Sequence, residues 1–375
     1  MPTSSEETDD ILEPASPQAV HIAEQALLGA LLFEPTLIAE VDLEAKHFDN
    51  RTHALLFAAM RTVPLPDPEQ HRENADWVAA VYAKARPQAP GLPHTYPHTL
   101  ARACPRPEHA AAYAWMIRAG HTRRTLRIHA DQLGRTAADT TLPHQVEATV
   151  TQAERLGDLL DQLAGQFAPH PGSLPRTPLP PDTVAEATEE AVDDERLLLA
   201  TATAHPRTVK NMRWLTPADF TSALHGSLWR CITALVHRGS PVDPVTVLWE
   251  AQQTGLLDGT VTTRTLLEML SDTHGVPEHW GEKILHRSLL HRAGTVADHI
   301  IAVTDDPATT PYQMITGSRR ALAHFASVHT RWHRATTPTP PPSSPATRNR
   351  STPPSIRAGP VPAAALRPPR AGITR

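Results

Sequence analysis

The chain has 375 residues, a formal net charge of −5, 5% aromatic residues and 38 prolines. Few aromatic residues favour close-packed helices over a β-sandwich, and no apolar window is long enough to predict a membrane span. The two cysteines, Cys104 and Cys231, are too few for a disulfide framework, and residues 1–13 are acidic, unlike the basic start of a secretory signal. We therefore expect an all-α, cytoplasmic protein.

Residues 1–19 are polar and acidic, which predicts a disordered N-terminus. Helices are then predicted over 21–33, 36–41 and 48–60, the last with Asp49 or Asn50 as its N-cap. Residues 64–107 are rich in proline and predict only one helix, over 77–85. Long helices over 108–133 and 143–167 complete a first domain, which we place at 20–167.

A proline-rich and then acidic stretch predicts a linker over 168–192. The acids Asp193, Asp194 and Glu195 are expected at a helix start, where carboxylates favour the helix dipole. We place a second domain at 193–332. Its helices are predicted over 195–204, 206–212, 221–237, 243–254, 263–270, 277–303 and 311–332. Residues 333–375 are rich in Pro and Arg and predict a disordered tail.

One pattern occurs in both domains, about 170 residues apart. Phe48 is followed at fixed spacing by His53 and Phe57, as Phe220 is by His225 and Trp229. The His and the second aromatic residue lie on one face of a predicted helix. We take the members of this pattern as core residues that define the repeat: Phe48, His53, Phe57, Phe220, His225 and Trp229.

Three further blocks repeat in the same order. Residues 23–28 correspond to 194–199, residues 113–117 to 280–284, and residues 143–146 to 311–314. A period of this length indicates duplicated domains and not the short unit of a solenoid.

The repeated pattern resembles the N-terminal domain of DnaB-type replicative DNA helicases. The resemblance implies two tandem all-α helical bundles, each ending in a long hairpin or linker helix. In that family the hairpin pairs neighbouring N-terminal domains and offers a surface to primase. It therefore implies self-association through the hairpin helices and a set of partner-binding residues: Arg123, Arg124, Arg127, Arg287, Leu290, His291 and Arg292. The alternative is that the basic residues among them form a solvated helix face.

The resemblance also implies that the second long helix of each copy docks on the ATPase domain of a replicative helicase. The helix over 311–332 carries an apolar stripe that includes Met314, Ile315, Leu322 and Phe325. Such a stripe must be buried against another surface. An ATPase domain on another chain is one such surface, and we also hypothesise that the two copies pair with each other within one chain.

No ATP-binding motif is visible in the sequence. A P-loop, G-x-x-x-x-G-K-[ST], requires a lysine directly after a glycine, and none of the four lysines (Lys46, Lys84, Lys210 and Lys283) follows one. We therefore expect no ATPase or unwinding activity from this polypeptide alone.

The histidines suggest no reaction centre. For His53 and His225, we favour the interpretation of a hydrogen-bonded histidine in an apolar core over that of a catalytic residue. His329 and His333 have a spacing that suits zinc, but nothing completes a ligand set, so a solvated helix end is favoured. We expect no catalytic, cofactor-binding or metal-binding residue.

These observations favour a scaffold that assembles with, or regulates, a replicative helicase or primase. One alternative is an accessory subunit of a split helicase whose ATPase lies on another chain. Another is a regulator tethered to DNA by its tail, because residues 331–375 contain eight arginines and no acid. Without those charges the formal balance of residues 1–330 is −13, which disfavours DNA binding by the domains themselves.

Overall fold

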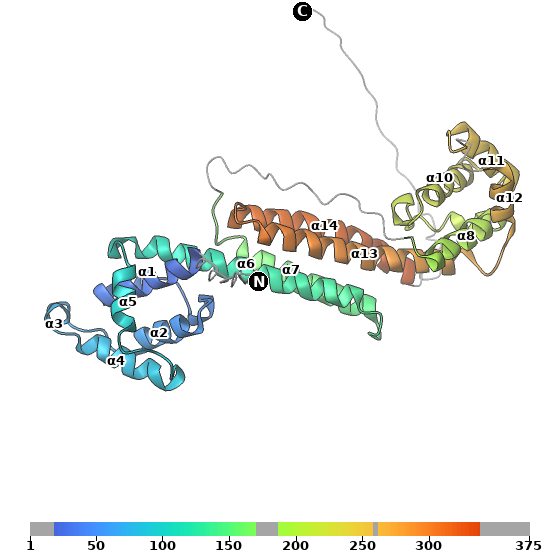
Figure 1. The fold of residues 1–375 in the computed structure, drawn as a ribbon. Coiled ribbons are helices and arrows are strands. Elements are labelled where there is room, and N and C mark those ends of the chain that lie inside the picture. The colour runs from blue at the N-terminus through green and yellow to red at the C-terminus, as the bar shows by residue number, and fades with distance from the viewer. Residues whose placement is uncertain (1–18, 170–186, 258–261, 338–375) are drawn as a thin grey trace, which may run out of the picture. The chain divides into compact units, whose positions relative to one another are not determined.

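In a computed structural model, the described residues 19–169, 187–257 and 262–337 form helices and loops, with no strand among them (Figure 1). The first copy contains α1 (Ala19–Phe33), α2 (Arg51–Thr62), α3 (Pro68–Glu73), α4 (Asp76–Ala85), α5 (Tyr96–Ala103), α6 (Ala110–Ala138) and α7 (Gln145–Leu163). The second contains α8 (Glu189–Ala204), α9 (Pro206–Val209), α10 (Ala223–Arg238), α11 (Pro244–Gln253), α12 (Thr263–Ser271), α13 (Pro277–Asp305) and α14 (Pro311–Thr336). The all-α prediction is confirmed.

Short 3-10 helices connect several of these elements. They span Pro35–Ala39, Ala45–His47, Arg86–Gln88, Pro107–His109 and Pro217–Asp219. The first of them replaces the short α-helix predicted over 36–41. The stretch 64–107 holds two helices, α3 and α5, that proline content concealed, since proline is tolerated in the first turn of each.

Side chains fix where the repeated helix begins. In α2 the side-chain oxygen of Asn50 accepts hydrogen bonds from the backbone N–H groups of Thr52 at 2.8 Å and His53 at 3.2 Å. Of the two predicted N-caps, Asn50 is therefore the one that caps the helix. Ser222 caps α10 through its hydroxyl group in the same way.

A separate core fills the first head, which we define as α1–α5 with the start of α6. Phe48 and Phe57 both lie in it, with ring centroids 4.9 Å apart. The contact between α1 and α5 depends on Gly29, because a Cβ atom there would lie 2.1 Å from the carbonyl oxygen of Leu100. A side chain at this position would force the two helices apart.

The other core runs through both copies without a break. It joins the second head, α8–α12, to four long helices, and includes Leu126 and Leu133 of α6, Leu160 of α7, Val296 of α13 and Phe325 of α14. The most extensive contact between any two described helices is that of α6 with α13. The hairpins α6–α7 and α13–α14 lie side by side (Figure 1), and their side chains share one hydrophobic core.

The apolar stripe on α14 is covered within the chain. Met314, Ile315 and Phe325 are buried, and Leu322 packs against them. The expectation that this stripe docks on another chain was wrong, because α13 and the first hairpin already provide the apolar surface that it requires.

The acidic cluster lies inside a helix and not at its start. α8 begins at Glu189, six residues before the predicted start at Glu195, and Asp194 and Glu195 are buried in the second head. The interpretation of these acids as a dipole-stabilising first turn was wrong. The part of the predicted linker before α8 falls mostly outside the described residues, as does the predicted tail beyond α14.

None of the described helices is both long and apolar enough to cross a membrane.

Candidate functional site

Each head holds a buried Glu–His pair at its centre. In the first head, Glu24 of α1 accepts a hydrogen bond from Nδ1 of His53 at 2.7 Å and another from the backbone N–H of Asp49 at 2.5 Å. Both Glu24 and His53 are fully buried. Because a carboxylate only accepts, Nδ1 of His53 carries the proton, and Nε2 accepts from the hydroxyl group of Tyr96 at 2.7 Å.

The second head repeats this pair. Glu195 of α8 accepts from Nδ1 of His225 at 2.7 Å, and from the backbone N–H of Thr221 at 2.5 Å. The hydroxyl group of Thr221 adds a further bond at 2.7 Å. In both heads the pair ties the start of one helix to a neighbouring helix, which is a structural task and suggests no reaction.

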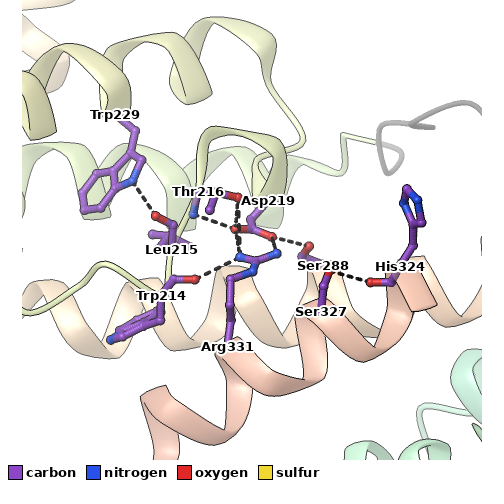
Figure 2. A network of polar contacts seen from close by, with 9 residues as sticks. All are labelled: Trp214, Leu215, Thr216, Asp219, Trp229, Ser288, His324, Ser327 and Arg331. Carbon is purple, nitrogen blue, oxygen red and sulfur yellow. Dashed lines mark hydrogen bonds and ion pairs between the residues drawn. The ribbon is translucent and has the colours of Figure 1, made fainter. Parts of the chain in front are cut away.

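A second buried carboxylate fastens α14 to its own head (Figure 2). Asp219 accepts two hydrogen bonds from the Arg331 guanidinium, at 2.5 and 2.9 Å. It also accepts from the hydroxyl group of Ser288 at 2.8 Å and the backbone N–H of Thr216 at 2.7 Å. Arg331 donates in addition to the carbonyl oxygen of Trp214 at 2.9 Å. The aspartate is thus fully paired although its side chain is buried.

The corresponding place in the first copy holds two histidines. His47 precedes Phe48 as Asp219 precedes Phe220, and His121 of α6 corresponds to Ser288 of α13. The two imidazole rings lie 4.8 Å apart. Burial, with some help from His47 and Arg124, lowers the pKa of His121 from 6.5 to about 4. The His121 ring is therefore neutral at pH 7, whereas the counterpart site holds the ion pair of Asp219 with Arg331.

Two predicted partner-binding residues join the two copies instead. Arg123 of α6 donates to the carbonyl oxygens of Thr304 at 2.5 Å, Asp306 at 2.8 Å and Thr309 at 2.8 Å, which seals the C-terminal end of α13. Arg127 forms an ion pair with Asp305. Cations are favoured at this end of a helix, so both arginines stabilise the pairing of α6 with α13.

Other predicted partner-binding residues are also engaged within the chain. Arg124 pairs with Asp49 at 3.1 Å, and Arg287 of α13 with Asp194 at 2.7 Å. Leu290 packs against the shared core. The structure therefore does not gather the seven predicted residues into one exposed patch.

His291 and Arg292 are half-buried on α13. His291 faces a cleft of about 1240 Å³ between the corner that joins α6 to α7 and the outer face of α13. Gln145, Thr188, His286 and Trp332 also line it. The cleft carries both acidic and basic side chains, Glu282 and Lys283 among them, and so points to no single class of ligand.

Sequence reasoning missed the carboxylate partners of these sites. Glu24 stands three residues after His21 on α1, and Asp219 stands in a turn, and neither position is marked by periodicity. The repeat itself could have identified the carboxylate partners of the two histidines, since Glu24 and Glu195 occupy matching positions before them.

The comparison with known families gives one match, found twice. The model of the DnaB-like helicase N terminal domain matches residues 16–119 and again residues 187–280, together more than half of the chain. Neither a curated protein nor a solved structure matches the chain. The two matched ranges contain the two Glu–His pairs described above. The chain belongs to the family of DnaB-like helicase N-terminal domains and carries that domain in two tandem copies.

Proposed function

We propose that this chain is a non-catalytic scaffold of DNA replication that associates with a replicative helicase or with primase. Domains of this family mediate helicase oligomerisation and contact primase, which gives the chain a helicase-related role. The pairing of α6 with α13 is the observation that carries the proposal. It lets one polypeptide supply a pair of N-terminal domains that a helicase assembles from two neighbouring subunits.

The pairing is supported by both apolar and polar contacts. The shared core runs through α6, α7, α13 and α14, and Arg123 binds three backbone carbonyl groups of the other copy. Because such contacts are made within one chain, no association entropy opposes them. Three chains would then bring six domains together, the number in a hexameric collar.

Light scattering tests the collar. A chain of 40.9 kDa that assembles as proposed has a trimer mass at micromolar concentration. A monodisperse monomer across that range contradicts the collar but leaves binding of a helicase or primase as a separate question.

A binding experiment tests the partner. The full chain is immobilised and offered purified replicative helicase and purified primase in turn. We expect saturable binding of at least one of them, and weaker binding by the double variant R123A/R127A, in which the copies lose the polar contacts between α6 and the C-terminal end of α13. The control is R135A, which removes an exposed arginine on the same helix that pairs only with Asp131 one turn away. No binding of either protein overturns the proposal.

An ATPase assay separates the scaffold from the accessory-subunit alternative. The purified chain alone is expected to hydrolyse no ATP above background. If it stimulates hydrolysis by a separate helicase motor, the accessory-subunit reading is favoured. Hydrolysis by the lone chain that survives further purification contradicts both.

A further inference from the structure

Three side chains that can bind a metal ion converge in the first head. His21 and Glu24 lie one turn apart on α1, and His53 comes from α2. One donor atom from each lies within 4.8 Å of the other two, and the rings of His21 and His53 have centroids 5.0 Å apart. Glu24 and His53 are buried, whereas His21 is half-buried at the edge of the head. Among the described residues, no other three such groups meet as closely.

We propose that His21, Glu24 and His53 form a binding site for a divalent transition-metal ion of the Zn²⁺ type. Two imidazoles and one carboxylate are ligands that zinc accepts, with a fourth position left for water. The site is separate from the pairing surface and does not depend on the proposed function.

The second head shows which part of this cluster the fold itself requires. Glu195 and His225 make the same Glu–His contact there, at the same 2.7 Å, but Val192 stands where the first head has His21. A histidine at this position is therefore not needed to build the head. Val192 is half-buried, as His21 is, so the two positions have similar surroundings.

The carboxylates of Glu24 and Glu195 also differ, in the number of hydrogen bonds that each accepts. Glu195 accepts a bond from the hydroxyl group of Thr221, which occupies one of its lone pairs. The first head has Asp49 at that place, and its side chain has no proton to donate when ionised. Glu24 thus retains acceptor capacity that its counterpart uses.

Tyr96 provides the support that a metal-binding histidine usually has. Its hydroxyl group lies 2.7 Å from Nε2 of His53. When an ion binds Nδ1, the single proton of the neutral ring moves to Nε2 and is donated to the Tyr96 oxygen, which fixes the ring. The backbone N–H of Asp49 orients the Glu24 carboxylate in the same way.

The three side chains must move slightly before all of them can bind one ion. Zinc bonds of about 2.0–2.1 Å place neighbouring ligand atoms about 3.4 Å apart. His53 Nδ1 and Glu24 Oε2, now at 2.7 Å, must separate slightly, and the His21 side chain must rotate inward. His21 lies in the first turn of α1 and is only half-buried, so the core does not enclose its ring. The bound ion would tie α1 to α2 and stabilise the first head.

The test measures Zn²⁺ binding to the full chain by competition with a chromogenic chelator, alongside the melting temperature with and without zinc. We expect one tight equivalent per chain and a higher melting temperature with zinc. The variant H21V, which copies the second head, should bind on the order of 100-fold more weakly, since one of three ligands is lost. Its circular dichroism should match that of the unaltered chain.

Two further variants keep the test decisive. H98V removes an exposed histidine of α5 and should leave the tight equivalent in place. V192H builds the missing ligand into the second head and should add weaker zinc binding there. Absence of a tight equivalent in the unaltered chain, or tight binding that H21V and H98V affect equally, overturns the proposal.

Discussion

In the first head Glu24 faces His53 at 2.7 Å, and in the second Glu195 faces His225 at the same distance. Each carboxylate also accepts a backbone N–H at 2.5 Å from the loop before the repeated helix. The sequences around these residues have diverged, yet the contact is unchanged. The Glu–His pair is therefore a structural feature that both heads share.

The two copies differ next to that pair. The second copy fastens α14 to its head through buried Asp219 and Arg331, whereas the first has His47 and His121 at the matching positions and Leu163 on α7 where Arg331 stands on α14. The two copies thus use different residues at the place where the last long helix meets the head. The following predictions test how far this contrast holds, from the largest expected effect to the smallest.

Removing either carboxylate of the Glu–His pairs should cause the largest loss. E24A and E195A each leave a buried histidine and backbone N–H groups without an acceptor, which costs about 3–5 kcal/mol in the free energy of unfolding. Urea unfolding measures the loss, and hydrogen exchange assigns it to one head. If one variant costs several kcal/mol and the other less than about 1 kcal/mol, the two pairs are not equivalent.

Breaking the tie to α14 should cost less. R331M leaves the buried Asp219 carboxylate without its cation, which should lower the free energy of unfolding by about 2–3 kcal/mol. Hydrogen exchange at the end of α14 should become faster. R319M is the matched control on the same helix, because Arg319 pairs with Asp161 on the exposed surface and should contribute less than about 0.5 kcal/mol. Equal effects of the two variants would contradict the assigned role of Asp219.

The close approach of α6 and α13 gives a smaller effect. A Cβ atom on Gly134 would lie 3.1 Å from the Cβ atom of Ala297, so G134L should overpack the contact and cost about 1–3 kcal/mol. Gly294, one turn before Ala297 on α13, has open space around it, and G294A should instead stabilise by about 0.5–1 kcal/mol through helix propensity. Thermal unfolding checks both signs. A neutral G134L would show that the helices do not approach as described.

The histidine site should give the smallest effect at neutral pH, because it shows itself only as a pH dependence at acid pH. The native state resists protonation of His121, whose pKa is lowered to about 4, while the unfolded chain protonates it near 6.5. Stability of the first head should therefore fall as pH decreases through that interval. H121S, which copies Ser288, should flatten this part of the profile. Identical profiles for both proteins would count against the assignment.

The sequence revealed the tandem copies because their signals are local. The spacing from Phe48 to His53 and Phe57, and the caps and prolines at helix ends, depend on neighbouring residues. The partners in the sites are distant: His225 stands 30 residues from Glu195, Arg331 stands 112 from Asp219, and Thr304 stands 181 from Arg123. Nothing in the pattern around Arg123 distinguishes an arginine that joins two copies from one that faces solvent.

The start of α8 is a second case in which the local sequence did not reveal the distant partners of a residue. Its acids were consistent with a helix start, and only the fold reveals that Asp194 pairs with Lys283 and Arg287 of α13. Likewise the apolar stripe on α14 predicted a buried face, but it did not identify α13 and the first hairpin as the surface that covers it. Contacts between residues far apart in the sequence determine these arrangements, and such contacts produce no periodic pattern in the sequence.

Pairing of the two copies within one polypeptide is tested most directly by a disulfide between Gly134 and Ala297. Cysteines at these positions, in a chain carrying C104A and C231A, would have Cβ atoms 3.1 Å apart, and a shift of a few tenths of an ångström brings this distance into the range that a disulfide spans. Under mild oxidation of dilute protein, we predict complete formation of a disulfide within one chain, at a rate independent of protein concentration. Free thiols, or disulfides that form only between chains and faster at higher concentration, would contradict the intramolecular pair.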